Sequence, residues 1–155
     1  MEKRIFKIAA GLGFLWYAVL RGAQALVIIL KGVAFSAIDI AQLTADVTLR
    51  FQISNPLMVG LRLKGIVGDI YLDGTKIGEV NHSYDYYMSG WHTHIIPVTA
   101  TISGSDVLNS FLVTLQTGDV DDFKNRTLAF DGKVLIGNYN VGVPVQITKN
   151  LNELL

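Results

Sequence analysis

The sequence contains no cysteine, and this absence excludes disulfide bonds, thiol catalysis and metal sites built on thiolates. It leaves the compartment open, because a chain without cysteine suits either side of a membrane. Charge of one sign is not in excess either, since 13 lysines and arginines balance 13 aspartates and glutamates. A neutral chain has no general attraction for nucleic acid, so we expect no nucleic-acid partner.

Sequence motifs typical of catalytic sites are scarce as well. The serine of Gly104-Ser105-Asp106 does not stand in a nucleophile elbow, and it is better placed to cap the helix predicted after it. Gly11-Leu12-Gly13 follows no predicted strand and lacks the third glycine of a dinucleotide-binding loop. We therefore expect a chain that is not an enzyme and that has no catalytic residues and no cofactor.

Metal ligands are few. His92 and His94 would face the same side of a strand, and His82 is the one further histidine. Zinc needs three or four ligands in tetrahedral geometry, so a hydrogen-bonded or solvated histidine pair is the simpler interpretation. The three aspartates between positions 119 and 122 lack the oxygen spacing and the glycine of a calcium loop. We predict no metal site.

Apolar residues, by contrast, are abundant and make up 50% of the 155 positions. The excess lies in the first thirty residues, and the remainder has an ordinary globular composition. We therefore expect an N-terminal hydrophobic helix at residues 1–33, acting as a membrane anchor or assembly helix, followed by one domain at residues 34–155.

The N-terminal segment starts basic and then becomes apolar. The charged stretch Lys3–Lys7 precedes the unbroken apolar run Ile8–Leu20, Arg21 interrupts it, and Leu26–Leu30 resumes it. A helix apolar almost all round must be buried in lipid or in protein. The residues expected to make those contacts are Ile8, Leu12, Leu15, Trp16, Val19, Arg21, Leu26 and Ile29.

Three interpretations of this segment compete. The first is a signal peptide cleaved after Ala25, which follows a small-residue site. The second is a membrane span from about Ile5 to Leu30, with the N-terminus in the cytoplasm and the domain outside, although Arg21 at mid-helix would cost about 2.5–3.5 kcal/mol. In the third, small and charged residues such as Gly11 and Ala18 face neighbouring protein subunits, including copies of the same chain.

The most informative stretch begins at Ala45. Residues Ala45–Ser54 alternate apolar and polar side chains, as a strand with one buried face does, and Asn55-Pro56 ends that strand because proline lacks an amide proton. A second strand, Leu61–Leu72, contains a slip in its apolar phase near Gly65 that indicates a bulge. Asp73-Gly74 then predicts a tight hairpin turn into a return strand that reaches Val80.

These residues resemble the late embryogenesis abundant type 2 family, also called the water stress and hypersensitive response domain. The resemblance rests on Ile53-Ser54-Asn55-Pro56, Ile70 to Gly74 and Ile77 to Val80, and it extends over about residues 37–149. It implies an all-β, immunoglobulin-like β-sandwich of about seven strands with one short helix. It implies no catalytic residues, and a role in protecting partners or membranes from drying.

The rest of the chain completes this outline. Residues 34–46 form a lead-in strand or connector, and Trp91–Ile102 alternates as a further strand that Pro97 places at an edge or bend. Val107–Leu115 carries apolar residues at helical spacing. Two more strands follow at Thr127–Ile136 and Val141–Lys149.

One segment stands out as a possible contact surface. Residues 81–91 form a predicted loop that holds Tyr84, Tyr86, Tyr87 and Trp91. Such side chains are enriched at protein interfaces, because they bury much area with few rotatable bonds. We interpret the loop either as a binding site for a protein partner or as an ordinary strand with half of these side chains facing the core.

The sequence thus predicts a non-catalytic structural or interaction module, anchored at a membrane or in a large assembly, and the family resemblance adds a desiccation or stress-protective role. An alternative is a structural subunit of a multi-protein particle, such as a bacteriophage virion or a cell-envelope machine. A second alternative is a carrier for a small apolar ligand held inside the sandwich.

Overall fold

The computed structural model describes residues 25–104, 109, 113, 117–118, 121–138 and 140–155. As predicted, the chain is all-β with seven strands. The described residues also include a short α-helix, α3 (Asp121–Lys124), and a 3-10 helix, η1 (Leu151–Glu153). The helix predicted at Val107–Leu115 lies almost entirely outside those residues. The strands are β1 (Val27–Asp39), β2 (Thr44–Asn55), β3 (Leu61–Leu72), β4 (Thr75–Met88), β5 (His92–Ser103), β6 (Thr127–Ile136) and β7 (Val141–Asn150).

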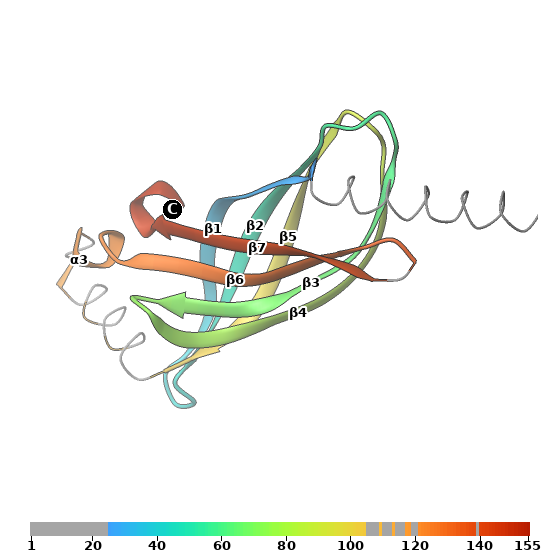
Figure 1. Cartoon of the computed structure of the whole chain (residues 1–155). Coiled ribbons are helices and arrows are strands. Elements are labelled where there is room, and N and C mark those ends of the chain that lie inside the picture. Colours follow the sequence, from blue (N-terminus) through green and yellow to red (C-terminus); the bar gives the residue numbers. More distant parts are fainter. Residues whose placement is uncertain (1–24, 105–108, 110–112, 114–116, 119–120, 139) are drawn as a thin grey trace, which may run out of the picture.

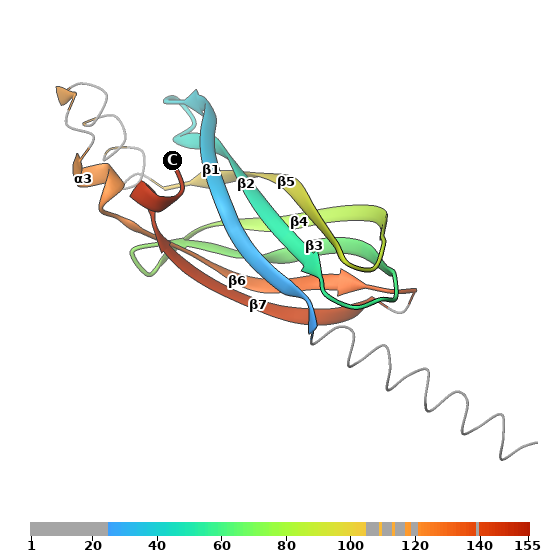
Figure 2. The ribbon, with the colours of Figure 1, turned by 90° about the horizontal axis from the view of Figure 1, so that it is seen from above.

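The strands form one antiparallel sheet in the order β1-β2-β5-β4-β3-β6-β7. Within the described residues, β4 and β5 pair at a single point, where Gly78 lies opposite Ile102. The sheet curls at this seam, so that its two halves face each other (Figures 1 and 2). Phe51 of β2 and Phe130 of β6 meet edge to face across the interior, with ring centroids 4.9 Å apart. The sequence predicts a sandwich of two packed sheets, whereas the structure contains one curled sheet whose two halves face each other.

The predicted alternation in β2 is confirmed. Val47, Leu49, Phe51 and Ile53 are fully buried, because every second residue of this strand faces the interior. The phase slip in β3 is also confirmed, since the register with both neighbouring strands shifts between Leu63 and Gly65. The inward-facing residues of the strands together form one continuous hydrophobic core.

Two glycines meet where β3 pairs with β6. Gly68 lies directly opposite Gly132, and a Cβ atom added to Gly132 would come 2.7 Å from the Cα atom of Gly68 and 2.7 Å from the Phe130 ring. The ring of Phe130 thus fills the space that two side chains would otherwise occupy. β3 and β6 can approach this closely only because Gly68 and Gly132 have no side chains.

The N-terminal helix was predicted to reach residue 33, and here the structure differs. Val27 begins β1, which runs across the expected domain boundary; Leu26 is buried in the core and Ile29 is 37% exposed. An apolar run of five residues cannot be assigned to helix or strand by periodicity, and pairing with β2 decides in favour of a strand. The predicted contact residues from Ile8 to Arg21 lie outside the described residues. No helix in the described ranges is both long enough and apolar enough to cross a membrane.

Both outer strands of the sheet are interrupted. The backbone amide of Val33 in β1 donates to the carbonyl oxygen of Leu154 at 3.0 Å, and the register with β2 shifts between Leu30 and Gly32. At the opposite edge, β7 contains Pro144, which has no amide proton to donate.

The predicted Asp73-Gly74 turn is confirmed, and both residues have positive φ, 48° and 81°. The Asp73 carboxylate accepts hydrogen bonds from the Arg126 Nε atom at 2.6 Å and from the Thr127 backbone amide at 2.9 Å. Burial raises the pKa of Asp73, but the hydrogen bond from Thr127 and the hydrogen bond and charge of Arg126 outweigh it. The pKa of Asp73 is therefore below its ordinary value.

This lowered pKa gives a pH-dependent contribution to stability. Because the folded chain holds the Asp73 proton more weakly than the unfolded chain, the contribution is present above about pH 4 and is lost as the pH falls further. We expect Asp73→Asn, which still suits the turn, to lower the melting temperature at pH 7, and we expect this deficit to shrink as the pH falls below about 4. Thermal melts at several pH values would show this, and an equal deficit at every pH would contradict it.

Candidate functional site

The segment predicted as an aromatic loop is mostly strand. Strand β4 continues to Met88, so Tyr84 and Tyr86 turn inward and pack against the core, while Tyr87 is 63% exposed. Trp91 follows in the turn to β5 and is 71% exposed. The simple two-residue alternation of a strand accounts for Tyr84 and Tyr86, and it leaves Tyr87 and Trp91 as candidates for a contact surface.

The inward tyrosines form a cluster with one histidine. The Tyr86 and His94 rings stack with centroids 4.1 Å apart, and the Tyr84 hydroxyl is 3.1 Å from His94 Nε2. This cluster lies beyond the single pairing of β4 with β5, where the two strands have separated. His92 is exposed, and no group of three ligating side chains that could hold a metal occurs among the described residues. The cluster therefore closes the seam of the sheet with aromatic packing.

The Asn55-Pro56 break organises a surface that the sequence did not reveal. Asn55 is 1% exposed, and its side chain connects two loops. Its Nδ2 atom donates to the Val59 carbonyl at 2.8 Å and to the Ser89 carbonyl at 3.2 Å, and its Oδ1 atom accepts from the Leu57 amide at 3.1 Å. One buried side chain thus holds the β2–β3 loop against the β4–β5 turn.

A backbone contact strengthens this connection. The Trp91 amide donates to the Leu57 carbonyl at 2.9 Å, and a Cβ atom added to Gly90 would come 2.6 Å from the same carbonyl oxygen. Only glycine permits this approach. The two loops therefore form one unit, whose shape is fixed by hydrogen bonds and by close backbone contact.

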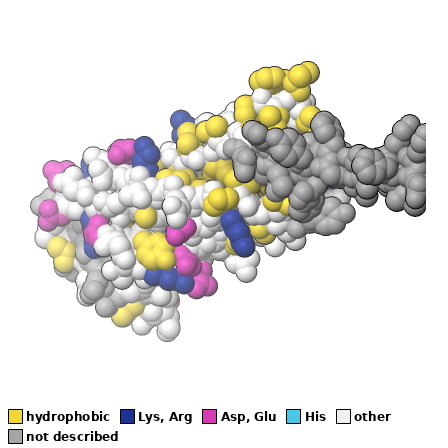
Figure 3. Space-filling view, in the orientation of Figure 1, with side chains coloured by type: hydrophobic (Ala, Val, Ile, Leu, Met, Phe, Trp, Pro, Cys, Tyr) yellow, Lys and Arg dark blue, Asp and Glu magenta, His cyan; other side chains and the backbone are white. Residues whose placement is uncertain are grey.

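The unit displays apolar side chains outward. Met58 is 80% exposed and Val59 is 69% exposed, and Trp91 and Tyr87 lie at the same end of the molecule. Tyr87 packs on Gly60, directly after Val59. We call Met58, Val59, Tyr87 and Trp91 the apolar tip. Figure 3 shows hydrophobic side chains gathered over the two loops at the top of the molecule.

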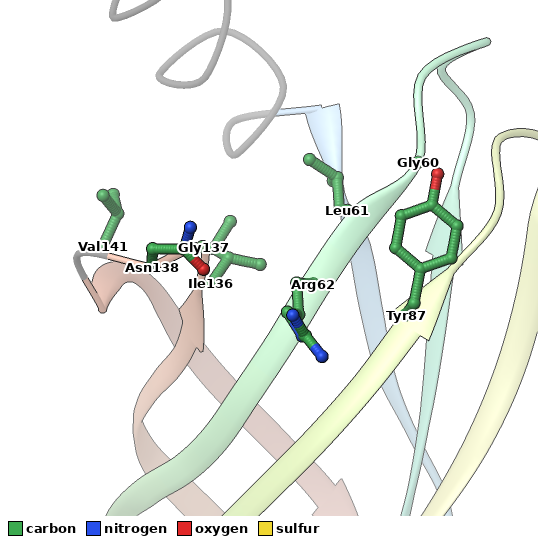
Figure 4. A pocket seen from close by; sticks show the side chains of 8 residues that line it. All are labelled: Gly60, Leu61, Arg62, Tyr87, Ile136, Gly137, Asn138 and Val141. Atoms are coloured by element: carbon green, nitrogen blue, oxygen red, sulfur yellow. The ribbon is translucent and has the colours of Figure 1, made fainter.

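A pocket of about 410 Å³ opens beside the apolar tip. In Figure 4, Tyr87 stands on one side of it, and Ile136, Asn138 and Val141 stand on the other. The Nε atom of Arg62 contacts Asp85 Oδ1 at 2.6 Å. The lining residues are Gly60, Leu61, Arg62, Tyr87, Ile136, Gly137, Asn138 and Val141.

Of the predicted site residues, Tyr87 and Trp91 thus belong to the apolar tip, whereas Tyr84 and Tyr86 belong to the seam. Sequence reasoning missed Met58 and Val59. Their signal was present, because three large apolar residues, Leu57, Met58 and Val59, directly follow Asn55-Pro56 in a segment that must be a loop.

No family model and no curated protein matches this chain. Among solved structures, a protein from Arabidopsis thaliana is similar with a TM-score of 0.53 and 9% identity, over 76% of this chain and 74% of that protein. A protein from Archaeoglobus fulgidus has a TM-score of 0.50 and 10% identity, over 78% of this chain and 93% of that protein. A third, provisionally assigned to the late embryogenesis abundant proteins, has a TM-score of 0.47 and 9% identity, over 96% and 83%. The first two likenesses show a shared small β fold.

Proposed function

We propose that this chain is a non-catalytic structural or interaction module that its N-terminal segment holds at a membrane. The observation that carries the proposal is the place where the N-terminal segment joins the sheet. Val27, the first residue of β1, pairs with Ser54, the neighbour of Asn55, so the apolar sequence before β1 joins the module at the end that displays the apolar tip. The apolar sequence therefore enters the module at the end that carries the apolar surface.

The start of β1 also improves the case for a membrane span. If β1 takes residues 27–30, the span would run from about Ile5 to Ala25, which is about 30 Å at 1.5 Å per residue. Arg21 would then lie near the end of the span and not at its middle. A long arginine side chain near a helix end reaches the headgroups, which lowers its cost. The basic start places the N-terminus in the cytoplasm and the module outside.

The resemblance to the late embryogenesis abundant type 2 family supports a more specific role. The Asn55-Pro56 break and the following hairpin stand where that family has them, and the facing halves of the curled sheet are compatible with its immunoglobulin-like sandwich. On this proposal the module protects membranes or membrane-bound partners during water stress. The inference is by analogy with a fold and not from site chemistry.

The alternative of a subunit in a large particle, such as a virion or cell-envelope machine, has one observation in its favour. Exposed tryptophan, tyrosine and methionine are the side chains that protein interfaces prefer, and the apolar tip presents all three. In that case the tip would bind a protein subunit or a second copy of this chain.

Substitutions in the full chain test the anchor. We expect Leu12→Lys combined with Leu15→Lys to move the protein from the membrane fraction to the soluble fraction, because each lysine at mid-span costs about 3 kcal/mol. Flotation with cell membranes after an alkaline wash measures this.

A matched control uses the same change at the opposite end of the module. Ile40 and Leu43 are 60% and 40% exposed in the β1–β2 turn, so Ile40→Lys with Leu43→Lys should leave the protein in the membrane fraction. Equal behaviour of the two double variants would refute anchoring by the N-terminal segment.

A further inference from the structure

We propose that the apolar tip inserts into the headgroup and acyl boundary of a phospholipid bilayer, as a second contact beside the N-terminal anchor. This inference rests on the proposed function and adds a second membrane contact to it. It assigns a ligand, the lipid surface, to four named side chains of the module.

Five backbone polar groups of the two loops are already satisfied inside the protein. The amides of Leu57 and Trp91 and the carbonyls of Leu57, Val59 and Ser89 all take part in hydrogen bonds within the two loops. A loop that faces water needs no such partners, because water supplies them. A loop that enters lipid does need them, because an unsatisfied backbone group costs several kcal/mol there.

The tip also carries no charge. The two loops, residues 55–60 and 89–91, contain no ionisable side chain. The nearest charged residues along β3 and β4 are Arg62 and Asp85, which form an ion pair that Lys64 shares. Moving the tip out of water therefore removes apolar surface from solvent without desolvating a charge.

Trp91 supports the assignment through its backbone. It has a φ of 58°, a conformation that is costly for a bulky residue and that glycine adopts freely. Trp91 is 71% exposed, so side-chain packing within the fold contributes little to offset that cost. Tryptophan is also the side chain that membrane interfaces favour. The start of β1 at the same end orients the tip toward the bilayer that holds the anchor.

The two tryptophans make a direct test possible. Trp16→Phe in the full chain leaves Trp91 as the one tryptophan. In phosphatidylcholine vesicles we expect its emission to shift to shorter wavelength, bromine on the lipid acyl chains to quench it, and quenching by aqueous acrylamide to fall several-fold. Adding Met58→Ser and Val59→Ser should reverse all three changes, while the circular dichroism spectrum stays the same because both side chains are mostly exposed.

Each remaining outcome overturns the proposal in a distinguishable way. If the protein floats with vesicles but Trp91 stays open to acrylamide, the anchor stands and the lipid contact fails. If Trp91 is shielded from acrylamide but bromine does not quench it, a protein surface covers the tip. If the protein does not float with vesicles, the anchor fails and the lipid contact fails with it.

Discussion

Replacing Asn55 by alanine should lower the free energy of unfolding by about 3 kcal/mol, a large part of the margin of a small domain. The change removes three hydrogen bonds at once and leaves the Val59 and Ser89 carbonyls and the Leu57 amide without their partner. Because Asn55 is buried, water cannot replace its side chain without opening the loops. Urea denaturation of the full chain in mild detergent, followed by circular dichroism, measures the loss.

A neighbouring substitution controls for this prediction. Ser54 shares a hydrogen bond with Thr93 on the exposed face, 3.0 Å between the two hydroxyl oxygens, so Ser54→Ala should cost about 0.5 kcal/mol or less. If Asn55→Ala cost no more than Ser54→Ala, the two loops would be held by other contacts, and the interpretation of Asn55 as their connector would be wrong.

The second large effect is expected at Gly132. A methyl group there would press on the Val67 carbonyl and on the Gly68 Cα atom of the paired strand, and on the ring of Phe130. The two strands cannot separate without breaking their hydrogen bonds, and the ring cannot move without leaving the core. We expect Gly132→Ala to lower the free energy of unfolding by about 2–3 kcal/mol, measured by the same denaturation experiment.

Gly32 offers the matched control, because it lies in a strand of the same sheet and is buried, but has room for a methyl group. The nearest atoms to an added Cβ are the Leu154 carbonyl oxygen at 3.4 Å and the Arg50 Cδ atom at 3.8 Å, which are ordinary contacts. Gly32→Ala should therefore change stability by less than about 1 kcal/mol. A similar cost at both glycines would mean that loss of glycine itself, and not the close approach of β3 and β6, sets the effect.

Local patterns predicted much of the fold. Alternation in Val47–Ile53, the Asp73-Gly74 turn and the strand Thr127–Ile136 are found where the sequence indicated them, because each depends on side chains a few residues apart. The start of β1 could not be predicted in this way. Whether Val27–Leu30 is helix or strand depends on pairing with β2, more than twenty residues later in the sequence.

In the candidate site, too, local sequence predicts some features, and contacts between distant residues decide the others. Asn55-Pro56 was recognised as the end of a strand, but its buried side chain acts on the Ser89 carbonyl, which is distant in the sequence. Tyr84 and Tyr86 were grouped with Tyr87 and Trp91 by composition alone. The sheet separates them, because a strand sends alternate side chains to opposite faces.

The interrupted outer strands determine how copies of this chain can associate. An intact outer strand presents a row of free amides and carbonyls on which another chain can add a strand, and that row is the usual route to fibrous aggregation. In β1 the bulge at Gly32 and the bond from Val33 to Leu154 break the row, and in β7 Pro144 breaks it. Even when many copies are crowded on a surface, strand addition at these two outer strands is therefore disfavoured.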